Sequence, residues 1–482
     1  MKTPCLILLL TCGSLLAADF QAGVARVKIT PPTPYWLSGY AARTNPAPTV
    51  LQDLWAKALA VRDPQGHQAV FVTMDLIGLP REISDEVATR ARKQFKLDRS
   101  HLLLNCSHTH CGPAVGHNLS VMFDFNAEDG LRVKRYSDEL TANLVRVIGE
   151  ALRNQAPANL AVGNGAVGFA INRRAPTANG FRIGVNTNGP VDHTMPVLRV
   201  TTPNGQLRAV LFGYGCHNTT LGGNFYQING DYAGHAQAAF EQTHPGVTAL
   251  FMQLCGGDQN PNPRGTLDLA RQYGQALATE VDRVLGTELH AVRPPIRTAS
   301  EAILLDFTPH TRQTFEDEVK NTDKFRQRRA RLMLAAYDRR KPIRRVSYPV
   351  QAVRFNQDLT FLALGGEVVV DYNLRAKQEF ADENLVVSGY CNDVMCYIPS
   401  KRILKEGGYE PMDSMIYYGM PGPFADTVEE RIFASIRKML KRVGARPAAQ
   451  TPIPSNVGRG SEARLKQARQ RLLNTDSAAV DN

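Results

Sequence analysis

Strand-like and helix-like runs alternate in the first third of the chain, and this alternation constrains the fold more than any other feature. Residues 69–79 (AVFVTMDLIGL) and 102–106 (LLLNC) are almost wholly apolar, as is typical of strands buried on both faces. Residues 82–95 and 137–154 follow them with helical periodicity. The order strand, helix, strand, helix predicts an α/β fold, here one large domain of mixed β-sheets flanked by helices.

The middle of the chain predicts antiparallel pairing. Residues 197–202 and 207–214 are rich in strand formers and flank Pro203-Asn204-Gly205, which is a strong hairpin signal. Further strands are expected at residues 248–254 and 360–364, and further helices at residues 231–242, 266–285, 316–336 and 428–443. After Gly444 the composition shifts to Pro, Ser, Asn and Gly, which predicts a polar tail over residues 445–482.

The N-terminus has the composition of a secretory signal. Lys2 precedes an apolar stretch over residues 6–16, and Ala17 and Ala18 supply small residues for cleavage. We therefore expect a signal peptide over residues 1–18 and a secreted or periplasmic protein. A buried N-terminal strand and a lipoprotein anchor at Cys12 are the alternatives. No later segment approaches ~18 consecutive apolar residues, so no transmembrane helix is expected in the mature chain.

The formal net charge of +11 raises the question of an anionic partner. The basic residues are scattered along the chain, so we expect no nucleic-acid binding. Their densest cluster, residues 326–345 (RQRRARLMLAAYDRRKPIRR), mixes with apolar residues at helical spacing. A solvated helix face with its exit loop explains this cluster. The alternative is contact with an anionic surface such as lipid headgroups.

Six of the eight cysteines lie beyond the signal, and none has the CxxC spacing of a zinc finger. Because an exported protein can form disulfides, we expect one or two bridges. Cys391 and Cys396 are close enough in sequence to form one of them.

Two histidine-containing segments follow strand-like runs. In NCSHTHCGP (residues 105–113), His108 and His110 are two apart, so on an extended backbone both would face the same side. Two such imidazoles can serve one metal ion, or one metal ion and one proton transfer. In GYGCHNTTLGGN (residues 213–224), His217 lies among small and polar residues and could complete a metal site. Read singly, each segment is also compatible with a structural histidine.

Three further segments carry polar side chains in glycine-rich or turn-like settings. The loop GGDQNPNPRG (residues 256–265) holds Asp258, Asn260 and Asn262, and it reads equally well as an ordinary Asn/Asp turn. In LALGGEVVVD (residues 362–371), Glu367 is either a helix N-terminal acid or a ligand. The tyrosines in NDVMCYIPS and GGYEPMD would not indicate metal binding by themselves.

In their order and approximate spacing, these five segments resemble the neutral/alkaline, non-lysosomal ceramidase family. The opening segment AGVARVKITPPTPYWLSGYA (residues 22–41) also matches that family, and the likeness extends to about residue 444. The resemblance implies a zinc hydrolase domain over residues 19–444. It implies that the zinc ligands are His108, His217, Glu367 and Tyr397. It further implies that His110 assists proton transfer or substrate binding, and that Tyr409 and the Asn172-Arg173 pair lie at the active site.

The chain departs from the family pattern at two places. The family loop Gly-Asp-x-Ser-Pro-Asn contains a serine proposed as a nucleophile, and here Asn260 stands at that position between Asp258 and Asn262. Members of the family also carry a C-terminal immunoglobulin-like domain, and the segment after Gly444 is too short and too polar for one.

The resulting hypothesis is Zn²⁺-dependent hydrolysis of the amide bond of an N-acyl lipid, giving a fatty acid and a sphingoid base from N-acylsphingosine. Activated water would attack the carbonyl, Tyr409 and Arg173 would stabilise the oxyanion, and His110 would protonate the leaving amine. Asp258, Asn260 and Asn262 would position the substrate. The alternatives are a zinc hydrolase for a different N-acyl or ester substrate and a non-catalytic binding protein on the same fold.

Overall fold

The computed structural model describes residues 18–448, so the predicted signal peptide and most of the predicted tail lie outside the described residues. The largest element is a mixed sheet of nine strands. Its strands lie side by side in the order β12 (Thr248–Gln253), β10 (Leu207–Tyr214), β9 (Thr194–Thr201), β6 (Ala156–Ala166), β1 (Phe20–Lys28), β3 (Trp55–Arg62), β4 (Gln68–Met74) and β5 (Leu102–Cys106), and β14 (His290–Val292) also pairs with β6.

A second sheet packs face to face against the first. It contains β15 (Ile296–Asp306), β16 (Arg345–Phe355), β17 (Leu359–Leu364) and β19 (Leu385–Ser388) in that order. Phenylalanines from both sheets meet between them, with the Phe71 and Phe361 ring centroids 4.9 Å apart. This buried apolar layer forms one continuous core from the two inner faces.

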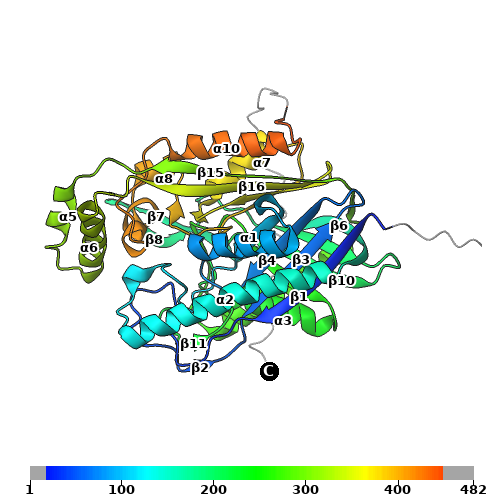
Figure 1. The fold of residues 1–482 in the computed structure, drawn as a ribbon, viewed down its shortest axis with the longest axis horizontal. Helices are drawn as coiled ribbons and strands as arrows, with labels where there is room; N and C mark the ends of the chain where they lie inside the picture. Colours follow the sequence, from blue (N-terminus) through cyan, green and yellow to red (C-terminus); the bar gives the residue numbers. More distant parts are fainter. Residues whose placement is uncertain (1–17, 449–482) are drawn as a thin grey trace, which may run out of the picture.

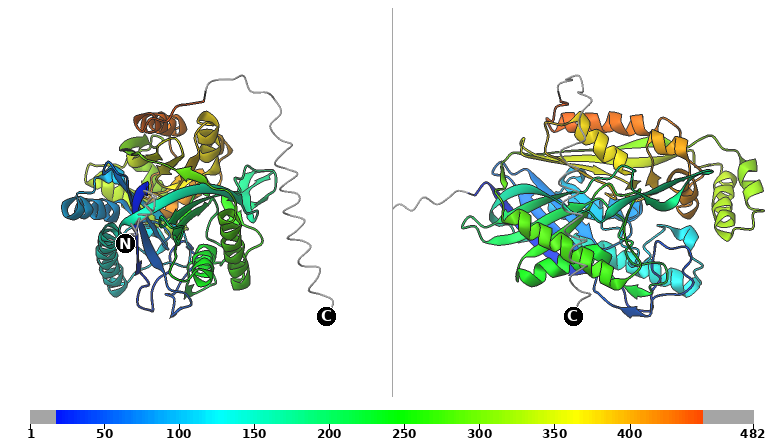
Figure 2. Two further views of the ribbon diagram at one scale, coloured as in Figure 1. Left: turned by 90° about the vertical axis from the view of Figure 1, so that its right-hand side faces the viewer. Right: turned by 180° about the vertical axis from the view of Figure 1, so that it is seen from behind.

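Helices cover the outer faces of both sheets, which gives the molecule four layers (Figure 1). The large sheet is covered by α1 (Arg81–Phe95), α2 (Ala127–Arg153), α3 (Asp231–Thr243) and α4 (Leu267–Leu285). The smaller sheet is covered by α7 (Val370–Glu379) and α10 (Val428–Arg442). Figure 2 shows the same layering from one end and from behind. No helix among residues 18–448 combines the length and the hydropathy needed to cross a bilayer.

The remaining elements are short and lie around the ends of the two sheets. The strands are β2 (Thr49–Val50), β7 (Ala170–Thr177), β8 (Gly180–Asn186), β11 (Gln227–Ile228), β13 (Gln259–Pro261), β18 (Glu367–Val368) and β20 (Tyr397–Ile398). The helical elements are α5 (Arg312–Glu318), α6 (Lys324–Asp338), α8 (Lys401–Glu406), α9 (Ser414–Tyr417), a π-helical turn (Tyr409–Asp413) and 3₁₀ turns at Arg99–His101 and Ser120–Met122.

The predicted fold class is confirmed, and the predicted hairpin is the antiparallel pair β9–β10. The single helix expected at residues 316–336 is wrong, because the chain forms α5 and α6 there. The side chain of Asp323 accepts a hydrogen bond from the Phe325 N–H and starts a new helix. The expected disulfides are also wrong. All six described cysteines are buried free thiols, and the Cys391 thiol donates to the Gly389 carbonyl instead of pairing with Cys396.

Asn105, the last residue but one of β5, joins strand ends that are distant in the sequence. Its side-chain amide donates to the Gln253 carbonyl over 3.1 Å and accepts from the Gln253 N–H over 2.8 Å, as a paired strand would. The same amide nitrogen donates to the carbonyl of Gly389, directly after β19, over 2.9 Å. One buried side chain therefore ties together the ends of β5, β12 and β19.

Candidate metal centre

The candidate site is built where parallel strands of the two sheets end. The pairs β4–β5, β10–β12 and β17–β19 are each parallel, so their carboxyl ends share an edge. His108 follows β5, His217 follows β10, and Glu367 follows β17. Tyr397 is brought to the same place because β18 and β20 are parallel, with Glu367 opposite Tyr397.

The four side chains predicted as ligands converge on one small volume. The Nε2 atoms of His108 and His217 lie 2.9 Å and 3.1 Å from Oε2 of Glu367. The Tyr397 hydroxyl lies 3.0 Å from Nε2 of His217. All four residues are buried. Ligand atoms around a tetrahedral zinc ion are separated by about 3.3 Å, so these spacings fit a small ion held between them.

The hydrogen bonds behind the histidines prepare them as ligands. Nδ1 of His108 contacts the Ile77 carbonyl at 2.6 Å, and Nδ1 of His217 contacts the Gly256 carbonyl at 2.8 Å. Each Nδ1 must therefore carry the hydrogen, which leaves the Nε2 lone pairs pointing into the centre. Burial and the nearby Arg173 guanidinium lower the pKa of His217 to about 3, which keeps its imidazole neutral.

The surroundings of the Glu367 carboxylate also test whether these residues fit a metal ion. Its Oε2 atom is buried and accepts no hydrogen bond within the described part of the chain, although two imidazole nitrogens lie near it. A buried carboxylate oxygen without a donor is costly unless a cation lies beside it. The donor set of two imidazoles, a carboxylate and a phenol suits Zn²⁺, so the residues fit the metal that the sequence predicts.

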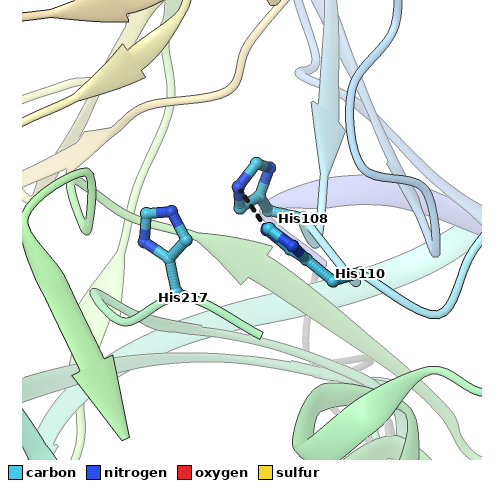
Figure 3. A group of neighbouring side chains, drawn as sticks. All are labelled: His108, His110 and His217. Atoms are coloured by element: carbon cyan, nitrogen blue, oxygen red, sulfur yellow. Dashed lines mark hydrogen bonds between the residues drawn. The ribbon is translucent and has the colours of Figure 1, made fainter. Parts of the chain in front are cut away.

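His110 joins this group by a route that differs from the predicted one. The backbone does not continue extended after β5, because His108 has a left-handed φ of 65°. The turn nevertheless aims both rings at one point, with their Nε2 atoms 3.2 Å apart (Figure 3). The ligand nitrogens of His108, His110 and His217 lie within 4.8 Å of one another, so the three histidines could hold a metal ion.

The His110 ring is tightly packed. The Tyr40 ring lies 4.8 Å away between centroids. A Cβ added to Gly39 would lie 2.4 Å from Nδ1 of His110, so only glycine is tolerated there. That Nδ1 is buried and has no partner among the described residues. Burial lowers the pKa of His110 well below its usual range. The ring is therefore a neutral group with one nitrogen still available.

Arg173, on β7, connects several site residues. Its guanidinium donates to the Tyr397 hydroxyl over 2.9 Å and to the side-chain Oδ1 of Asn260 over 3.4 Å. Its Nη1 atom lies 3.1 Å from Nε2 of His217. Its Nε donates to Glu410 over 2.9 Å. Arg173 thus orients the phenol that faces the centre.

Glu410 and Tyr418 were missed by sequence reasoning. The buried Glu410 carboxylate binds Arg173 and also the buried Arg174, and so neutralises two cations behind the site. Tyr418, which follows the short helix α9, donates to Glu367 from 51 residues away. The family resemblance implies a role for Tyr409, and the adjacent Glu410 carries no pattern of its own that indicates one. No local pattern distinguishes Tyr418 from its neighbour Tyr417.

Asp258 and Asn262 belong to the same loop, but one is buried and the other is exposed. Both carboxylate oxygens of Asp258 are engaged, one by Asn172 over 3.0 Å and one by the Val370 N–H at the start of α7 over 2.9 Å. This arrangement holds the loop in place and leaves no acceptor facing the centre. Asn262 is exposed at the surface. The contacts of Asp258 and the exposure of Asn262 do not test the predicted substrate-binding role of these two residues, which stays a prediction.

Asn260 and Tyr409 lie beside Arg173 at the centre. The side-chain Oδ1 of Asn260 accepts from the Thr219 hydroxyl over 3.3 Å. The side-chain nitrogen Nδ2 of Asn260 makes no hydrogen bond within the described residues. The Tyr409 ring lies 5.6 Å from the Tyr397 ring and 5.6 Å from the Arg173 guanidinium carbon. Both side chains can therefore reach a molecule bound next to Tyr397.

The sequence is similar to those of known proteins. A profile described as neutral/alkaline non-lysosomal ceramidase, N-terminal, matches residues 20–279. Neutral ceramidase A of Dictyostelium discoideum is 27% identical over 225 residues, which is 44% of this chain and 31% of that protein. Neutral ceramidase of Pseudomonas aeruginosa is 25% identical over 244 residues, which is 47% of this chain and 34% of that protein. The aligned part is thus about a third of each relative.

Two solved structures share the fold. The crystal structure of neutral ceramidase from Pseudomonas aeruginosa superposes with a TM-score of 0.68 at 19% identity, covering 91% of this chain and 77% of that one. A ceramidase complexed with C2 superposes with a TM-score of 0.70 at 18% identity, with the same coverage.

Fold and site together define the class, a layered α/β protein with a buried side-chain cluster that could hold a metal ion. Because the profile matches more than half of the chain, the protein belongs to the neutral/alkaline non-lysosomal ceramidase family.

Proposed function

We propose that this protein is a zinc-dependent amide hydrolase acting on an N-acyl lipid in the manner of a ceramidase. The observation that carries the proposal is the convergence of His108, His217, Glu367 and Tyr397. Both histidines are held by backbone carbonyls, and Oε2 of the glutamate has no donor among residues 18–448. Family membership supports the substrate class, because the named relatives are ceramidases.

Each residue around the centre has a role that follows from its contacts. A zinc ion held by the four ligands would activate water for attack on a carbonyl carbon. Tyr409 and Arg173 lie where a developing oxyanion needs hydrogen-bond donors and positive charge. The Nε2 atom of His110 lies 3.2 Å from Nε2 of the ligand His108, so this ring is placed beside the centre, where it would assist proton transfer or substrate binding.

Asn260 changes the chemistry expected of the loop. A carboxamide cannot act as an acyl-accepting nucleophile, so the proposed route uses direct attack by water. The unbonded amide nitrogen of Asn260 would donate to the substrate. The Asn260→Ala variant should therefore bind zinc normally and turn over substrate about tenfold more slowly, as expected for the loss of one hydrogen bond. Loss of zinc in that variant would show that Asn260 supports the metal instead.

The decisive experiment measures zinc content and turnover on one purified sample, with a fluorescent long-chain N-acyl-sphingosine as substrate. We expect about one zinc per chain and chelator-sensitive release of fatty acid. His217→Ala should lose both. The control is His235→Ala, which removes a half-buried histidine whose one side-chain hydrogen bond within the described residues is with Asn229. Zinc without turnover would favour another N-acyl or ester substrate. Absence of zinc would favour a binding protein.

We also propose that the protein is exported, on the strength of the N-terminal composition. Expression of the full chain in a bacterial host followed by N-terminal sequencing tests this. A mature chain that begins at Asp19 in the exported fraction supports the proposal, and an intact Met1 in the cytoplasmic fraction contradicts it.

A further inference from the structure

A second concave site lies far from the candidate metal centre. It is a cleft of about 610 Å³ between the start of β4, the start of β15 and the end of α10. Its polar lining consists of Gln65, His67, Gln68, His101, Arg297, Thr298 and Arg442. Gln68 begins β4, whereas the other end of this strand leads to Ile77, which contacts His108. Seven strand residues span about 20 Å, so the two sites lie at opposite ends of the sheet.

The lining of this basic cleft carries two arginines, and the nearest carboxylate that acts on Arg442 is Glu301, which is bound by Lys438 and lies outside the lining. No aspartate or glutamate contributes to it. Arg297 and Arg442 are both exposed, and neither forms an ion pair or a hydrogen bond with the described residues. Arg442 ends α10, where the partial negative charge of the helix terminus favours a cation but supplies no fixed partner. Two guanidinium groups are therefore free to bind a ligand.

Two histidines also line the cleft. Nδ1 of His67 is committed to the buried Asp63 at 2.9 Å, which directs the other ring nitrogen away from that carboxylate. Asp63 also accepts from the Ile296 N–H over 2.8 Å, so this acid is used to anchor β15. Nδ1 of His101 is buried and has no partner among residues 18–448. The two imidazole rings thus add polar groups to the charge of the cleft.

The Arg297 guanidinium lies against the backbone at Gly444. Gly444 follows α10 with a φ of 89°, and a Cβ added there would lie 2.8 Å from Nη1 of Arg297. A glycine at this position lets the guanidinium lie close to the chain. Guanidinium forks match the oxygen geometry of phosphate, and the volume admits a ligand of small-metabolite size.

We propose that the basic cleft is a second ligand site, which binds a soluble phosphate-bearing small molecule through Arg297 and Arg442. The proposal does not depend on the hydrolase activity, because no residue of the metal centre takes part. Inorganic pyrophosphate is a suitable probe, since it offers the shared chemistry of phosphate monoesters and diphosphates without an organic group.

Isothermal titration calorimetry with pyrophosphate tests the proposal on the full chain, after dialysis against a chelator so that zinc cannot bind the probe. We expect saturable binding at one site per chain, weakened on the order of a hundredfold in the Arg297→Gln/Arg442→Gln variant, about tenfold for each arginine. The matched control is Arg146→Gln/Arg331→Gln, which removes the same charge from exposed helix positions. The control should bind as the unaltered protein does.

Three results would overturn the proposal. They are absence of saturable binding to the unaltered chain, equal weakening in both double variants, and unchanged affinity in Arg297→Gln/Arg442→Gln. A His101→Asn variant gives an independent check, because it should weaken pyrophosphate binding without altering net charge at neutral pH. Thermal unfolding of each variant verifies that the fold is intact. Binding only to phosphatidic-acid vesicles, and not to free pyrophosphate, would contradict a soluble ligand.

Discussion

The hydroxyl of Tyr418 donates a hydrogen bond of 2.5 Å to Oε1 of Glu367, while the other carboxylate oxygen faces His108 and His217. This contact divides the carboxylate into one oxygen held by the protein and one directed at the candidate metal centre. A ligand that is oriented in this way loses little freedom when a metal ion binds.

Replacing Tyr418 by Phe should weaken zinc binding roughly 10- to 100-fold, because Glu367 would lose the donor that fixes its orientation. Competition with a chromophoric chelator measures the affinity directly. Tyr417→Phe is the control, since that neighbouring hydroxyl makes no hydrogen bond within the described residues. Equal affinities for Tyr418→Phe and Tyr417→Phe would show that Tyr418 does not position the ligand.

Removal of the metal should lower thermal stability, since a ligand that binds only the folded state stabilises it. With free zinc at about 1,000 times its dissociation constant, the expected gain is about 4 kcal/mol. Differential scanning calorimetry with chelator and then with excess zinc measures the change. His217→Ala should respond to neither treatment and His235→Ala should respond as the unaltered chain does. A zinc response in His217→Ala would contradict the assigned ligand set.

Replacing Glu410 by Gln should destabilise the fold by about 3 kcal/mol, because Arg173 and Arg174 are both buried and would lose their shared counter-charge. Denaturant unfolding measures the difference. Glu86→Gln breaks an exposed pair with Arg90 and should cost less than about 1 kcal/mol. Similar losses of stability in the two variants would mean that the buried ion pairs of Glu410 stabilise the fold no more than an exposed ion pair does.

Asp393 should make stability fall as pH rises. Burial raises the pKa of this carboxyl from 3.8 to about 8, with Glu82 and Asp85 adding to the effect and Arg81 opposing it. Between these values the folded chain retains a proton that the unfolded chain has lost. The contribution to stability is therefore greatest below about pH 4 and declines toward pH 8, by up to about 1.4 kcal/mol per pH unit.

The Asp393→Asn variant tests this pH dependence, because a carboxamide cannot ionise. Unfolding free energies measured from pH 5 to pH 8 should show the variant gaining on the unaltered chain as pH rises. Asp382→Asn, at an exposed position, should run parallel to the unaltered chain. A constant difference between Asp393→Asn and the unaltered chain would rule out ionisation as the cause.

The strands and helices were largely predictable, because burial on both faces leaves apolar runs such as residues 102–106 that match β5. His108 and His217 could be singled out because each follows a strand, and strand ends are where side chains become available for chemistry. Tyr397 could not, since a tyrosine in an irregular segment looks like any core aromatic, and only the family resemblance selected it. Tyr418 and Glu410 depend on contacts between residues far apart in the chain, which no local pattern encodes. The expected disulfides failed because closeness in sequence does not orient two thiols toward each other.

The side-chain clamp of Asn105 bears on when the metal centre forms. His108, His217 and Glu367 come from three remote parts of the chain, and the loops that separate them are closed by the amide that joins the ends of β5, β12 and β19. The entropy of closing those loops is therefore lost during folding and not when the ion arrives. In this arrangement the apoprotein is a preassembled receptor, and metal uptake resembles the docking of a ligand more than the last step of folding.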